Sequence, residues 1–201
     1  MGTFDRFKPN PPGTSSTSRA PTEAELLLAR REIHIAEAID DFCANSAIAQ
    51  LLFLQMQDPA QPVSLLVDSP GGALTAGLAI LDTICFLTPP VHTRTETGAY
   101  GLALWLLTAG KKGHRLIAAD AILSIEPSQF YGDHCNLETA ARIHDSLADK
   151  LAGWSNLPKT EILTALQGKG RRFTAQEAIA AGLVDGMIPG MEEKAAPWTL
   201  Y

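Results

Sequence analysis

Two glycine-rich turns are the segments of this chain whose residue types could do chemistry. Residues 68–72 read Asp-Ser-Pro-Gly-Gly after an apolar run, and residues 97–101 read Thr-Gly-Ala-Tyr-Gly before another apolar run. Glycine permits the backbone angles of tight turns, and N–H groups at a strand-to-helix junction can point at a negatively charged oxygen. The turns therefore predict backbone donors for an oxyanion.

Few other side chains are placed to act as nucleophiles. The hydroxyl of Ser69 is expected to cap the helix that follows its turn. Ser124 falls in a strand with no histidine close to it in sequence. His134 and Cys135 are adjacent, and neighbours on a strand point to opposite faces, so we interpret them as part of a surface loop. The remaining histidines are single residues that we interpret as surface or structural: His34, His92, His114 and His144.

The composition excludes several classes of protein. The net charge of −6 is unfavourable for binding nucleic acid. The short basic run at residues 111–115 has no interleaved aromatic residues for base stacking and is expected to be a solvated turn. With 46% hydrophobic residues the chain can build one core. No apolar run approaches the roughly 20 residues of a membrane span, so no membrane association is expected.

The three cysteines, Cys43, Cys85 and Cys135, form neither a metal-binding spacing nor a disulfide framework. We expect a cytoplasmic protein with no metal and no cofactor. Cys43 and Cys85 lie in helical patterns and are expected to be small buried hydrophobic residues.

Hydrophobic periodicity predicts strands that alternate with helices. Expected strands cover residues 32–35, 63–67, 91–95, 115–118 and 122–125. Expected helices cover residues 24–31, 42–57, 73–87, 100–109, 137–154, 158–166 and 174–181. Such alternation indicates an α/β fold with a parallel sheet. We expect a mobile N-terminal segment at residues 1–22, one domain at residues 23–190 and a C-terminal tail at residues 191–201.

Several motifs in order resemble the ClpP family of ATP-dependent proteases. They begin with Ile-Asp-Asp at residues 39–41 and Ser-Pro-Gly-Gly at residues 69–72, and continue with Leu-Leu-Thr-Ala-Gly at residues 106–110. Phe-Thr-Ala-Gln-Glu-Ala at residues 173–178 and Gly-Leu-Val-Asp at residues 182–185 complete them. The resemblance covers residues 31–187. It implies the ClpP/crotonase-type fold, with stacked β-sheet turns, outer helices and a protruding handle.

The resemblance also assigns the family's catalytic positions. The nucleophilic serine matches Gly101, the histidine matches Glu126 and the aspartate matches Arg171. If one residue is deleted, Glu126 matches the glutamine that follows the family's histidine, and no histidine is present in either alignment. Glycine cannot attack a carbonyl, a glutamate has no hydroxyl beside it to activate, and arginine cannot orient an imidazolium by charge. No catalytic residue is therefore expected at these degenerate triad positions.

Two further site predictions follow from the resemblance. Glu126 and Arg171 either form an ion pair across the vacated site or are solvated independently. The family's oxyanion donors match the backbone amides of Gly72 and Leu102. The alternative interpretation is that these glycines only allow tight turns.

The resemblance implies a ClpP-like subunit without its own active site, similar to ClpR-type paralogues, that acts in ring assembly. Its expected partners are active ClpP-type subunits in heptameric rings, a hexameric Clp ATPase and unfolded polypeptide. Residues 42–54 could contribute to an apolar docking surface or form a core helix. Two other functions remain open: an active serine peptidase that uses unrecognised residues, and a crotonase-like acyl-CoA enzyme.

Overall fold

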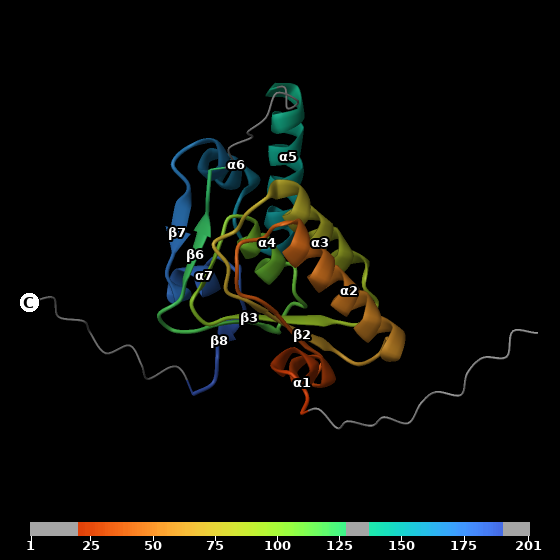
Figure 1. Cartoon of the computed structure of the whole chain (residues 1–201). Helices are drawn as coiled ribbons and strands as arrows, with labels where there is room; N and C mark the ends of the chain where they lie inside the picture. The colour runs from red at the N-terminus through yellow and green to blue at the C-terminus, as the bar shows by residue number, and fades with distance from the viewer. Residues whose placement is uncertain (1–19, 128–136, 191–201) are drawn as a thin grey trace, which may run out of the picture.

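A computed structural model describes residues 20–127 and 137–190 and has an α/β fold (Figure 1). The N-terminal segment before residue 20, the tail after residue 190, His134 and Cys135 lie outside the described residues. The strands are β1 (Glu32–Ile35), β2 (Val63–Val67), β3 (Val91–Thr95), β4 (Gly98–Tyr100), β5 (Arg115–Ile117), β6 (Ile122–Ile125), β7 (Arg171–Phe173) and β8 (Gly186–Met187). The helices are α1 (Glu23–Ala29), α2 (Asp41–Gln57), α3 (Leu74–Phe86), α4 (Leu102–Thr108), α5 (Leu137–Trp154), α6 (Lys159–Gln167) and α7 (Ala175–Ala180).

The strands form two sheets. The larger sheet has five parallel strands in the order β1-β2-β3-β5-β8. The smaller sheet has the order β4-β6-β7, with β4 and β6 parallel and β6 and β7 antiparallel. Each parallel pair needs a crossover connection, and α2 and α3 supply the first two crossovers of the larger sheet. The predicted α/β fold with a parallel sheet is confirmed.

One buried hydrophobic core includes residues of both sheets and of the helices beside them. In α4, all residues from Ala103 to Thr108 are buried, as the uninterrupted apolar sequence predicts. Trp105 of this helix is 1% exposed, and its indole Nε1 donates to the carbonyl of Leu147, 2.9 Å away. This bond joins the buried α4 to α5 in the next layer.

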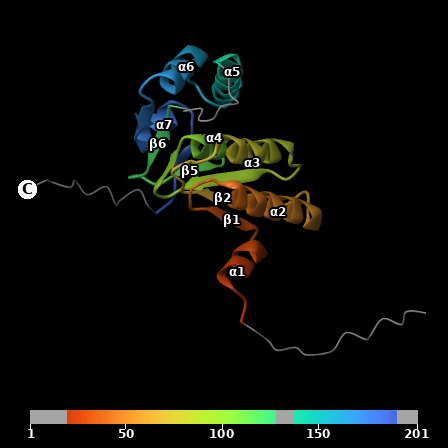
Figure 2. The same cartoon turned by 45° about the horizontal axis from the view of Figure 1, so that its top comes forward.

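Helix α5 extends beyond the sheets, and α6 packs beside it (Figures 1 and 2). The hydrophobic residues of α5 repeat with helical spacing, and one face of this helix, including Leu147 and Leu151, is buried. Lys159 at the start of α6 pairs with Asp145 at 2.8 Å and with Asp149 at 2.7 Å, so two ion pairs tie the helices together. This arrangement matches the expected handle.

Arg115 corrects the interpretation of the basic run as a solvated turn. Residues 111–114 are exposed, but Arg115 is 2% exposed and forms a two-pronged ion pair with Asp185. Its Nη2 and Nε atoms lie 2.6 and 2.9 Å from the two carboxylate oxygens. Burial raises the pKa of Asp185, but the bonds from Arg115 and Gly113 outweigh this effect and hold it below its ordinary value. The pair joins the segment just before β8 to β5.

Other differences from prediction are local. Tyr100 ends β4 rather than beginning a helix, because Gly101 after it has a positive φ of 54°. Strands β4, β7 and β8, which have two or three residues each, were not predicted. Cys85 is exposed rather than buried. Within the described ranges, no helix has the length and apolar character needed to cross a bilayer.

Candidate functional site

The first glycine-rich turn follows β2 and is held by Ser69. The Ser69 hydroxyl donates to the carbonyl of Glu37 at 2.6 Å and accepts from the N–H of Gly71 at 3.2 Å. The prediction that Ser69 caps the next helix is wrong, because α3 begins after Ala73 without a side-chain cap. Ser69 is 1% exposed, and it therefore stabilises its own turn and is not available as a nucleophile.

Gly71 and Gly72 form a close backbone contact with the segment around Ile39. The N–H of Ile39 donates to the carbonyl of Gly71 at 2.8 Å, and the N–H of Ala73 donates to the carbonyl of Ile39 at 2.7 Å. A Cβ atom at position 72 would lie 2.2 Å from the Ile39 carbonyl oxygen, and one at position 71 would lie 2.7 Å from the Tyr100 oxygen. Both positions require glycine because there is no space for a side chain.

The amides expected to bind an oxyanion are those of Gly72 and Leu102. Neither N–H has a hydrogen-bond acceptor among the described residues. The Leu102 amide belongs to the first turn of α4, where helices leave N–H groups without internal acceptors. Gly77 lies so close to Leu102 that an added Cβ would be 2.5 Å from its side chain. The start of α4 therefore packs directly on the helix that follows Gly72.

Asp68 joins the two glycine-rich turns. This role of Asp68 was not predicted from the sequence. One of its carboxylate oxygens accepts four hydrogen bonds from the segment between β3 and β4: from Thr95 Oγ1 and from the N–H groups of Glu96, Thr97 and Gly98, at 2.8 to 3.3 Å. Burial raises the pKa of Asp68, but these bonds outweigh it and hold the pKa below its ordinary value. The sequence feature that could have indicated this role is an aspartate placed directly after a buried strand.

Gly101 follows β4, at a position where a Cβ atom would face Glu126. Its φ of 54° and ψ of −131° are unusual for a residue with a side chain. The Gly101 N–H donates to the carbonyl of Ser124 at 3.0 Å. Among residues 20–127 and 137–190, an added Cβ would meet only the Cβ of Glu126, at 3.9 Å. A side chain at position 101 would therefore have space and would face Glu126.

The three residues matched to the family's triad lie at one edge of the smaller sheet. Gly101 follows β4, Glu126 follows β6, and Arg171 begins β7, which runs antiparallel to β6. In the strand register Ile125 is the partner of Arg171. The ends of three neighbouring strands therefore bring positions far apart in sequence together.

The Arg171 guanidinium does not pair with Glu126. It forms an ion pair with Glu161 of α6, and it lies over the ring of Phe173, 4.6 Å from the ring centre. No hydrogen bond or ion pair joins the Glu126 carboxylate to another described residue. The hypothesis of an ion pair across the site is wrong, because Glu161 is the partner of Arg171.

The other residues considered as nucleophiles do not form a catalytic couple in the described part of the chain. Ser124 is 2% exposed, and its hydroxyl donates to the carbonyl of Arg171 at 3.4 Å. His34 Nε2 lies 2.9 Å from Glu32 Oε1, and the His92 ring stacks on the His114 ring with their centres 4.0 Å apart. Within residues 20–127 and 137–190, no group of three or more His, Cys, Asp or Glu residues could hold a metal ion.

A comparison with protein-family models places this site in a known context. The model described as Clp protease matches residues 15–190 of the 201-residue chain, which includes both turns and all three positions at the edge of the smaller sheet. The parallel sheet, the layered helices and the extended α5 agree with that match. The chain belongs to the Clp protease family.

Proposed function

We propose that this chain is a ClpP-like subunit of an ATP-dependent Clp protease that does not hydrolyse peptides by itself. The observation that carries the proposal is the edge of the smaller sheet, where Gly101, Glu126 and Arg171 lie at the ends of adjacent strands. Acyl transfer by a serine needs a hydroxyl, a base in contact with it and a group that orients the base. Gly101 has no hydroxyl for Glu126 to activate.

The backbone part of the site supports binding without cleavage. The amides of Gly72 and Leu102 have no acceptor among the described residues, and Asp68 fixes the turns that carry them. Backbone donors do not depend on the side chain at position 101. On this proposal, the pair of amides can hold a peptide carbonyl that no nucleophile attacks.

The role in assembly is supported by an uncharged face of α2. After Asp41 the helix has no charged residue as far as Gln57. Phe42, Phe53 and Met56 are 83%, 46% and 85% exposed, and their spacing places them along one face. Phe86 at the end of α3 is 78% exposed. Exposed apolar surface of this kind marks protein–protein contact, and we assign it to ring neighbours and the docked ATPase.

The test is to co-express the full chain with a catalytic Clp protease subunit from the same cell and to measure the mass of the intact particle. A mixed ring containing both chains is the expected result. A particle made of this chain alone that cleaves a fluorogenic peptide would contradict the proposal.

A matched pair of variants separates assembly from folding. Met56→Glu places a charge on the exposed α2 face and should remove the chain from the mixed particle without lowering its melting temperature. Lys112→Glu, on the exposed turn before β5, is the control and should assemble like the wild type. If Met56→Glu assembles normally, the assignment of this face to ring neighbours is wrong.

A further inference from the structure

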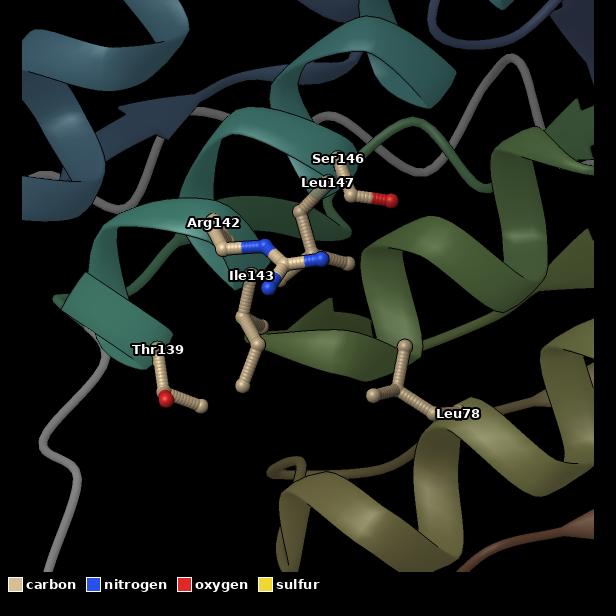
Figure 3. A pocket seen from close by; sticks show the side chains of 6 residues that line it. All are labelled: Leu78, Thr139, Arg142, Ile143, Ser146 and Leu147. Carbon is tan, nitrogen blue, oxygen red and sulfur yellow. The ribbon is translucent and has the colours of Figure 1, made fainter. Parts of the chain in front are cut away.

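A groove of about 350 Å³ lies between α3 and α5 (Figure 3). Leu78 contributes from α3, and Ile143 and Leu147 contribute from α5, so its apolar surface comes from two helices. Among the described residues, the polar side chains that line it belong to α5: Thr139, Arg142 and Ser146. Figure 3 shows the Arg142 guanidinium extended over the space beside Ile143 and Leu147. The groove therefore combines an apolar wall with a cation.

The Arg142 charge is not balanced by a described carboxylate. Arg142 is exposed, and no ion pair joins it to another described residue. The acidic residues that follow on α5, Asp145 and Asp149, pair with Lys159. Across the groove, Asp82 of α3 pairs with Lys150 at 3.4 Å.

Glu138 lies one helical turn before Arg142 and forms no ion pair with it. In a chain of net charge −6, the groove thus has a guanidinium that can bind an anion. The planar guanidinium fork matches a carboxylate in two parallel hydrogen bonds.

The combination of surfaces selects a chemical class of ligand. A volume of about 350 Å³ is near the lower end of the range for small-ligand sites, about 300–1,000 Å³, and suits the end of a peptide rather than a folded partner. We propose that the groove binds the free carboxyl end of a peptide whose last side chain is apolar. The carboxylate pairs with Arg142, and the side chain lies against Leu78, Ile143 and Leu147.

The chemistry of a protease supplies this ligand. Hydrolysis of a peptide bond by water gives one product with a new carboxylate and one with a new amine. The groove would retain the first product after cleavage by an active subunit. The assignment goes beyond the proposed assembly role and does not depend on it, because binding can be measured on this chain alone.

The experiment measures binding of N-terminally fluorescein-labelled Ala-Ala-Leu by fluorescence anisotropy to the full chain. The free acid should bind, and the same peptide with a C-terminal carboxamide should bind at least about tenfold more weakly, because it loses the charge-assisted bonds. Arg142→Gln should weaken binding of the free acid by a similar factor, and Leu78→Ala should also weaken it. Lys112→Gln, outside the groove, is the control and should bind like the wild type.

Several results would overturn the assignment. These are no measurable binding of the free acid, equal binding of the acid and the carboxamide, or unchanged binding by a folded Arg142→Gln variant. A carboxamide peptide with an internal glutamate that binds as tightly as the free acid would show that the chain end is not recognised. Chromatography of the peptide after incubation separates the two proposals, because cleavage would contradict the proposed function and leave the groove assignment standing.

Discussion

The turn at residues 71–72 and position 101 both carry glycine, but the surrounding structure treats them differently. At Gly72 an added Cβ would lie 2.2 Å from the Ile39 carbonyl oxygen, whereas at Gly101 the only described atom within reach would be the Cβ of Glu126, at 3.9 Å. Packing therefore requires glycine in the first turn, while only the backbone angles favour it at position 101. The comparison teaches that close packing fixes the backbone of the first turn, whereas the structure leaves space for a side chain at position 101.

The largest expected effect tests the tightly packed side of this comparison. Gly72→Ala should lower the free energy of unfolding by about 3 kcal/mol, because the new methyl group overlaps the Ile39 backbone and cannot move away from it. Chemical denaturation monitored by circular dichroism measures the change.

Gly101→Ala is the matched control in the same assay. It should cost only about 1–2 kcal/mol, from the positive φ, because the methyl group has space. Equal losses at the two positions would remove the distinction between them.

The second prediction concerns the carboxylate that joins the turns. Asp68→Asn should lower the free energy of unfolding at pH 7 by about 2 kcal/mol, because the four bonds to this side chain lose their charge assistance. Thermal denaturation at pH 7 measures it. A loss below the error of the measurement would mean that Asp68 does not hold the second turn.

The lowered pKa of Asp68 also predicts how the free energy of unfolding changes with pH. The pKa of Asp68 in the folded chain lies below its ordinary value of 3.8, so its contribution to stability is present above about pH 4 and is lost as the pH falls further. The wild type should therefore lose stability in acid more steeply than Asp68→Asn. Asp185 also has a lowered pKa and keeps part of the slope in both proteins. Parallel curves would contradict the assigned pKa shift.

The smallest expected effect concerns Arg171, which lies at the same end of the smaller sheet as Gly101. Arg171→Ala should lower the free energy of unfolding by about 1 kcal/mol or less, because its side chain and that of Glu161 are 41% and 39% exposed. The contact with the Phe173 ring adds a similarly small amount. Glu161→Ala should have the same effect, and the double variant should lose less than the sum. A loss above about 3 kcal/mol would mean that Arg171 has a buried role.

Sequence patterns predicted the elements that have strong local signals. The strand at residues 63–67 and the helix at residues 137–154 are long, apolar or periodic, and both are present at β2 and α5. The strands β4, β7 and β8 have no such signal, because their two or three residues are extended only through pairing with distant strands.

The site was predictable only in part for the same reason. The glycine turns are visible as local motifs, and the family resemblance located Gly101, Glu126 and Arg171. The partners of the charged residues were not predictable from the sequence. Arg115 binds the carboxylate of Asp185, 70 residues away, and Arg171 of β7 pairs with Glu161 of α6. These contacts depend on how the sheets and helices pack, which no local pattern records.

The central claim is that the site lacks only its side chains. It is tested most directly by restoring them in a Gly101→Ser, Glu126→His, Arg171→Asp variant. The variant and the wild type would each be co-assembled with a catalytic Clp protease subunit whose own nucleophilic serine is replaced by alanine, and then treated with a fluorophosphonate probe. We predict labelling of the variant and none of the wild-type chain. A restored variant that enters the particle and is not labelled would contradict the claim that only side chains are missing, and labelling of the wild-type chain would contradict its lack of a nucleophile.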